Sequence, residues 1–97
     1  MQDIRGIVEQ IQRITKEAVS LIEPQVNEVI RNKINDNNQI ELLLDRLLDY
    51  AGMDNSGLIL FKRLCRYYYK LNPKVAAGYV NTYRDLYDDT YENNDEE

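Results

Sequence analysis

The sequence predicts an all-α protein, an up-down helical bundle of four helices, or of five if Pro24 breaks the first one. Three observations lead to this prediction. Apolar residues recur at steps of three and four along several long segments. Short polar stretches that contain asparagine, glycine or proline separate these segments. Nowhere does the sequence alternate apolar and polar residues as a half-buried strand does.

The first predicted helix begins near Asp3 and carries an apolar stripe in nearly heptad spacing. The stripe consists of Ile4, Ile7, Ile11, Ile14, Ala18 and Leu21. It fits two roles, packing against the chain's own helices or forming the seam of a homodimer, and the sequence leaves both open. Pro24 predicts a kink or break near Glu23, because proline removes one backbone hydrogen bond and clashes with the preceding turn.

The second helix is predicted to follow a polar, asparagine-rich loop over residues 32–38. Asn38 and Glu41 have the spacing of a capping box and mark its start. We expect Gly52 to end this helix in the left-handed conformation, which glycine adopts without a steric penalty. Its apolar face carries Ile40, Leu43, Leu44, Leu47, Leu48 and Ala51.

The third helix is predicted over residues 56–71, with a cap supplied by one of residues 54–56. Apolar residues occur on more than one face of this helix, which predicts a central place in the bundle. Asn72 and Pro73 start the last helix, since asparagine caps helices and proline fits their first turn. The apolar face of this helix carries Ala76, Tyr79, Val80, Tyr83, Leu86 and Tyr87.

Charged residues and tyrosines are distributed unevenly along the chain. Residues 55–84 contain six basic residues and no acidic one, whereas residues 85–97 contain seven acidic residues and no basic one. Seven of the eight tyrosines lie between Tyr67 and Tyr91. Because the net charge of −5 sums such opposite blocks, the local charge is a better guide to binding than the total.

A basic face with tyrosines at its edge is therefore the candidate binding site. Arg63, Arg66 and Lys70 stand three and four residues apart, so they share one side of the third helix. The alternative is a solvated polar face, which an amphipathic helix needs opposite its core, and for the tyrosines a place at the edge of the core. The predicted partner-binding residues are Arg63, Arg66, Tyr67, Lys70, Lys74, Tyr87 and Tyr91.

These features favour a non-enzymatic adaptor or regulatory module that docks an acidic protein partner on the basic, tyrosine-rich face. Non-specific nucleic-acid binding by the same face, modulated by the acidic tail, is the alternative. A third hypothesis is that the acidic residues mimic nucleic acid and bind a basic protein. Catalysis fits poorly, because histidine is absent and the four glycines are isolated, and neither cofactor nor metal is predicted. Cys65, the one cysteine, is expected to be a buried, inert thiol.

Residues 1–88 are predicted to form a single domain, because 97 residues are too few for two separate cores. Residues 89–97 are predicted to be an acidic, frayed or disordered tail, since carboxylates at a helix C-terminus face the negative end of its dipole. This tail either competes with a partner for the basic face or only solubilises the protein. No apolar run approaches the roughly 20 residues that span a bilayer and no secretory signal is visible, so we expect a cytoplasmic protein.

Overall fold

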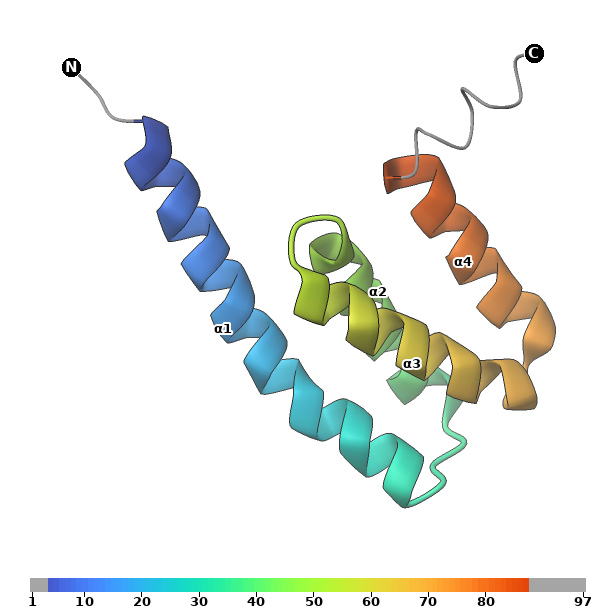
Figure 1. The fold of residues 1–97 in the computed structure, drawn as a ribbon. Coiled ribbons are helices and arrows are strands. Elements are labelled where there is room, and N and C mark those ends of the chain that lie inside the picture. Colours follow the sequence, from blue (N-terminus) through green and yellow to red (C-terminus); the bar gives the residue numbers. More distant parts are fainter. Residues whose placement is uncertain (1–3, 88–97) are drawn as a thin grey trace, which may run out of the picture.

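The computed structural model describes residues 4–87, which form four α-helices joined by short connections (Figure 1). Successive helices run in opposite directions, which confirms the predicted all-α up-down bundle. Tyr91 and the predicted tail, residues 89–97, lie outside the described residues. The helices are α1 (Ile4–Arg31), α2 (Asn37–Ala51), α3 (Asn55–Leu71) and α4 (Pro73–Tyr87).

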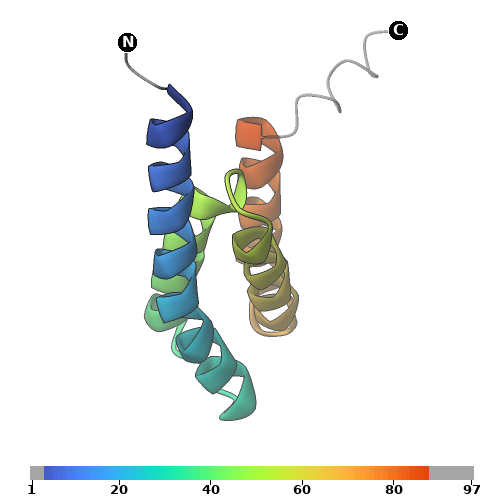
Figure 2. The same ribbon diagram turned by 60° about the vertical axis from the view of Figure 1, so that its left-hand side comes forward.

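The first helix continues through Pro24, so the break that the sequence left open beside a kink does not occur, and residues 4–87 form the four predicted helices. Figure 2 shows that the ribbon of α1 bends in its C-terminal part, the milder effect of proline. Val26 and Val29, just beyond the proline, are fully buried. Their packing against the bundle holds this part of α1 in place despite the backbone hydrogen bond that proline removes.

The α2–α3 pair forms the centre of the bundle, as predicted for the third helix. Within residues 4–87, α1 and α4 flank this pair on opposite sides and do not contact each other (Figures 1 and 2). The C-terminal half of α1 supplies its share of the core, whereas α4 supplies a single fully buried residue, Ala76. The core consists of Val19, Ile22, Val26, Val29, Ile40, Leu43, Leu44, Leu47, Ala51, Leu60, Phe61, Leu64, Cys65, Tyr68 and Ala76.

The start of α2 differs from the prediction, because Asp36 and not Asn38 caps it. The Asp36 carboxylate accepts hydrogen bonds from the backbone N–H groups of Asn38 at 3.0 Å and Gln39 at 3.4 Å. An ionised carboxylate satisfies two donors of the first turn and also interacts favourably with the positive end of the helix dipole. The helix therefore begins earlier than the capping-box spacing indicated.

The caps of the last two helices follow the prediction. The Asp54 carboxylate accepts from the backbone N–H of Gly57 at 3.1 Å, which starts α3. The Asn72 side chain accepts from the backbone N–H of Val75 at 3.5 Å, and Pro73 occupies the first position of α4. Proline at this position loses no helical hydrogen bond, so the sharp connection between α3 and α4 costs little.

Gly52 ends α2 with φ −82° and ψ −11°, so the expected left-handed conformation is wrong. The glycine serves a different purpose. The ring of Tyr87 lies directly against it, and a Cβ atom at position 52 would collide with that ring. The Tyr87 hydroxyl also donates to the backbone carbonyl of Leu48 at 3.0 Å. Glycine is therefore required at position 52, because any side chain there would keep the end of α4 from approaching the end of α2.

Candidate functional site

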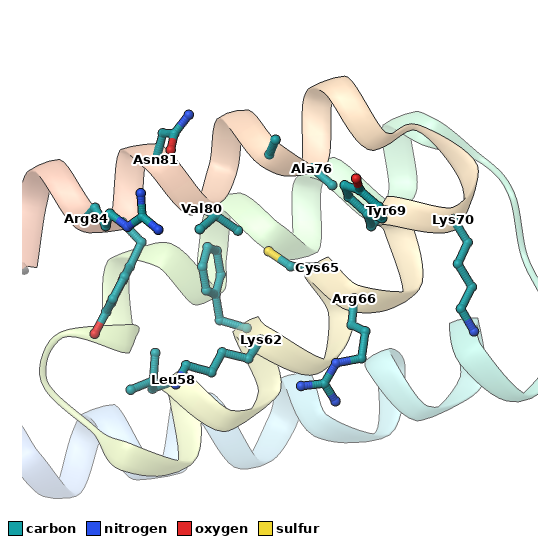
Figure 3. A pocket seen from close by; sticks show the side chains of 13 residues that line it. Leu58, Lys62, Cys65, Arg66, Tyr69, Lys70, Ala76, Val80, Asn81 and Arg84 are labelled. Atoms are coloured by element: carbon teal, nitrogen blue, oxygen red, sulfur yellow. The ribbon is translucent and has the colours of Figure 1, made fainter.

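A groove of about 620 Å³ lies between α3 and α4 (Figure 3). Its walls are mostly apolar, with Leu58 and Phe61 contributed by α3 and Val80 by α4. The groove stays open because small side chains, Ala76 and Ala77, occupy the first part of α4 where it passes α3. No long side chain of α4 fills the space there, and Leu58 of α3 remains half-exposed, whereas Phe61 and Cys65 are buried beneath the groove.

Cations border this groove on both sides. Lys62, Arg66 and Lys70 stand four residues apart and form a row along α3, and Arg84 lies on α4 (Figure 3). None of the thirteen described residues that line the groove is acidic. Like charges four apart on a helix repel each other by a few tenths of a kcal/mol. An anionic group bound along this row would relieve that repulsion.

The structure separates the predicted binding face into two parts. Arg66 and Lys70 line the groove. Arg63 instead points toward α1, where its guanidinium donates to the Asn27 side-chain oxygen at 2.6 Å. Tyr67 is half-buried, and its hydroxyl donates to the backbone carbonyl of Ile34 at 2.7 Å.

Of the remaining predicted residues, Lys74 is exposed on α4 but does not line the groove. Tyr87 lies against Gly52, near the far end of α4, and Tyr91 is outside the described residues.

The groove also contains residues that the sequence did not single out as a site. Tyr69 is 58% exposed and stands at one end of the groove, where its ring is the accessible tyrosine of the 67–69 triplet. Its spacing of seven and three residues from Lys62 and Arg66 puts the three on one side of α3. That spacing could have identified Tyr69, but only with knowledge of which side of α3 faces α4.

The other tyrosines attach α4 and α3 to α2. Tyr79 donates to the Asp45 carboxylate at 2.7 Å, and Tyr68 donates to the Glu41 carboxylate at 2.5 Å. Burial, reinforced by the Glu41 hydrogen bond, raises the pKa of Tyr68 to about 12. Burial and the Asp45 hydrogen bond likewise raise the pKa of Tyr79. Both phenols therefore stay protonated near neutral pH, so the bonds that attach α3 and α4, the two walls of the groove, to α2 persist.

The aromatic rings continue this attachment along α4. The Tyr83 ring lies between Phe61 and Tyr87, at centroid distances of 5.8 Å and 5.3 Å, in tilted arrangements. Such pairs contribute about 0.5–1.5 kcal/mol each beyond the area that they bury. The α4 wall is thus held by aromatic contacts and phenol hydrogen bonds more than by deep apolar packing.

Cys65 lies on the floor of the groove and is buried, as the sequence predicted. Burial raises the pKa of its thiol to about 12. The thiolate, which is the reactive form of cysteine, is therefore scarce near neutral pH. In the groove this side chain acts as a small apolar surface.

No family model, curated protein or solved structure matches the chain. Among helices α1 to α4, none combines the length and the apolar character that crossing a membrane requires.

Proposed function

We propose that the chain is a non-enzymatic interaction module that binds an acidic, amphipathic segment of a protein partner in the groove between α3 and α4. One observation carries the proposal: an apolar floor is bordered by Lys62, Arg66 and Lys70 on one wall and Arg84 on the other, without an acidic lining residue among those described. An amphipathic helix fits such a groove because its apolar stripe enters while its flanks meet the rims.

The relative sizes of the interactions favour a peptide over nucleic acid. Burying one leucine or phenylalanine side chain is worth about 1.5–3 kcal/mol, whereas an exposed ion pair is worth about 0–1 kcal/mol. The apolar part of the groove, where Val80 is 38% exposed and Leu58 is half-buried, therefore offers more affinity than the rim. A phosphate backbone would use only the rim. The cations mainly select an acidic partner and accelerate its association.

A direct test uses a labelled peptide of about 16 residues, roughly four helical turns. It carries leucines at i, i+3, i+4 and i+7 with glutamates on both flanks. The control peptide has the same composition in an order that disperses the leucines around the helix. Fluorescence anisotropy should show tighter binding of the amphipathic peptide, by about tenfold or more. Equal binding of the two peptides would contradict the proposal.

A third probe, a single-stranded oligonucleotide, distinguishes peptide binding from the alternative function, non-specific nucleic-acid binding. Phosphate binding weakens log-linearly and steeply as salt rises, whereas binding anchored by apolar contacts weakens less. If the oligonucleotide binds more tightly than the amphipathic peptide and shows the steep salt dependence, the groove is a nucleic-acid site instead.

A pair of matched variants locates the peptide on the structure. Arg66→Glu reverses one charge at the rim of the groove and should weaken peptide binding by about tenfold at low salt. Arg46→Glu makes the same change at an exposed position of α2 outside the groove, and it should have little effect. If both variants weaken binding equally, the effect reflects net charge, and the groove is not the site.

A further inference from the structure

Two apolar stripes run along α1, and the bundle covers only one of them. The covered stripe is the one that joins the core, with Val19, Ile22, Val26 and Val29 between 0% and 5% exposed. The near-heptad stripe lies beside it on the helix surface. Its large described members Ile7, Ile11, Ile14 and Leu21 are between 44% and 71% exposed, whereas the small Ala18 is half-buried. The chain's own helices therefore leave the large side chains of the near-heptad stripe uncovered.

This exposure is not simply the result of α1 extending beyond the bundle. The N-terminal end of α1 does extend past the turn between α2 and α3 (Figure 1). However, Leu21 lies well inside the packed part of the helix, next to Ile22, and it is 71% exposed where Ile22 is 5% exposed. The uncovered stripe thus continues alongside the core stripe. From position 7 to position 21 it measures about 21 Å at 1.5 Å per residue.

We propose that this stripe, the α1 seam, is a surface for a second copy of the chain, paired antiparallel through α1. The seam has the a and d spacing with which helices pack against one another by inserting side chains between those of the partner. The exposed residues that flank it are almost uncharged: Val8 and Gln10, with Glu17 as the one acidic residue, whereas Thr15 on the side of the core is buried. A strongly acidic or basic partner would therefore find little complementary charge beside the seam. The same seam of a second copy could pack against it without bringing like charges together.

The antiparallel register follows from the order of the seam residues. Placing Ile11 opposite Ile14 of the second copy also places Ile7 opposite Ala18 of the second copy, so that a large side chain meets a small one. In the same register Glu17 lies beside Gln10 of the second copy, and no two carboxylates face each other. A parallel pair would instead place isoleucine at both a and d positions, a pattern that favours three or four strands. Opposed helix dipoles add a small preference for the antiparallel pair.

The first experiment measures the mass of the full chain by sedimentation equilibrium between about 1 µM and about 1 mM. We expect a reversible monomer–dimer equilibrium. Ile14→Glu places a charge in the middle of the seam and should raise the dimer dissociation constant by at least about 100-fold, because the carboxylate would have to be buried. The matched control is Ser20→Glu, at an exposed position on the opposite side of α1, which should change the constant by less than about threefold.

Two results would overturn this proposal: a wild-type chain that stays monomeric at about 1 mM, or Ile14→Glu and Ser20→Glu chains that dimerise alike. Since Ile14 is 64% exposed and outside the core, its replacement should leave helicity and thermal unfolding of the monomer unchanged. Circular dichroism checks this point.

Cross-linking of folded protein tests the direction of pairing and does not depend on the glutamate variants. In the antiparallel register, Gln10→Cys and Glu17→Cys chains should link to each other with a short bismaleimide when mixed, and they should do so more efficiently than either variant links to itself. Efficient linking of each variant to itself would overturn the antiparallel arrangement. The wild-type chain, whose one cysteine is the buried Cys65, provides the blank.

Discussion

The groove between α3 and α4 and the α1 seam are both uncovered apolar surfaces, but they differ in the charge at their borders. Lys62, Arg66 and Lys70 border the groove, whereas Val8 and Gln10 border the seam together with one acidic residue, Glu17. Apolar exposure alone indicates that a surface can gain free energy by being covered. We propose that the charge at the border determines which surface covers each one. The cationic border of the groove would select an acidic segment, and the weakly charged border of the seam would accept the same seam of a second copy.

The largest expected effect is a reciprocal loss of binding in two variants that introduce the same carboxylate. Val80→Glu places it in the groove, and Ile14→Glu places it on the seam. We expect Val80→Glu to weaken binding of the acidic peptide by about 100-fold, or ~2.7 kcal/mol, and to leave dimerisation intact. Ile14→Glu should do the reverse. Anisotropy and sedimentation on both variants provide the measurement, and a variant that loses both activities would show that the two surfaces are not independent.

The next largest effect is expected from Gly52→Ala, which should destabilise the groove side of the fold and leave the seam unchanged. Gly52→Ala adds a Cβ atom where the ring of Tyr87 lies, so the end of α4 must shift. Overpacking of this kind costs about 1–3 kcal/mol, and chemical denaturation should show that loss in the free energy of unfolding. Peptide binding should weaken because one wall of the groove moves. The dimer constant, which depends on α1, should stay within about twofold.

Alkaline pH should loosen the groove side of the molecule in a graded way. Folding raises the pKa of Tyr68 to about 12 from an unfolded value of about 10, because the phenol is buried and bonded to Glu41. The stabilising contribution is complete below about pH 10 and is lost as pH rises toward 12. The slope is about 1.4 kcal/mol per pH unit for each such tyrosine, and Tyr79 acts in the same direction.

Denaturation curves recorded from about pH 9 to about pH 12 measure this slope. Tyr68→Phe should reduce it, because one of the titrating phenols is gone. An unfolding free energy that is constant over this range would contradict the assigned role of the phenols.

The smallest expected effect is a gain in stability from Gly78→Ala, which should change neither the groove nor the seam. A Cβ atom at Gly78 would meet nothing within 4 Å, and the position is exposed in the interior of α4. Gly78→Ala should therefore raise the free energy of unfolding by about 0.5–1 kcal/mol, the usual cost of glycine in a helix. Peptide binding and dimerisation should both remain at wild-type values. This variant is also the matched control for Gly52→Ala.

The helices could be predicted because periodicity, caps and turns agree along the chain. The errors arose where one residue type serves two purposes. Gly52 suits a left-handed helix end, but it is required by Tyr87, 35 positions later in the chain and invisible to local reasoning. In α1 the near-heptad stripe and the stripe of Val19 and Ile22 are both apolar, and only the packing of α2 and α3 determines which one is buried.

The candidate site was predictable in its charge but not in its shape. Arg66 and Lys70 belong to the predicted face and line the groove. Arg63 is next to them on the helix surface, yet the rotation of α3 directs it to Asn27 on α1. The same rotation exposes Tyr69 and half-buries Tyr67. A rotation of one helix about its axis is a property of tertiary packing, and single-sequence periodicity does not determine it.

The placement of α1 and α4 on opposite sides of the central pair has a consequence for valency. If the chain pairs through α1 as proposed, the groove at α4 would stay uncovered in each copy, and the pair would present two identical grooves. A target with two acidic segments on a linker of suitable length would occupy both, with an avidity that can exceed either single affinity by about 10²–10⁴. Weak grooves would then suffice for tight capture, and the protein concentration that governs dimerisation would also determine how strongly such targets are held.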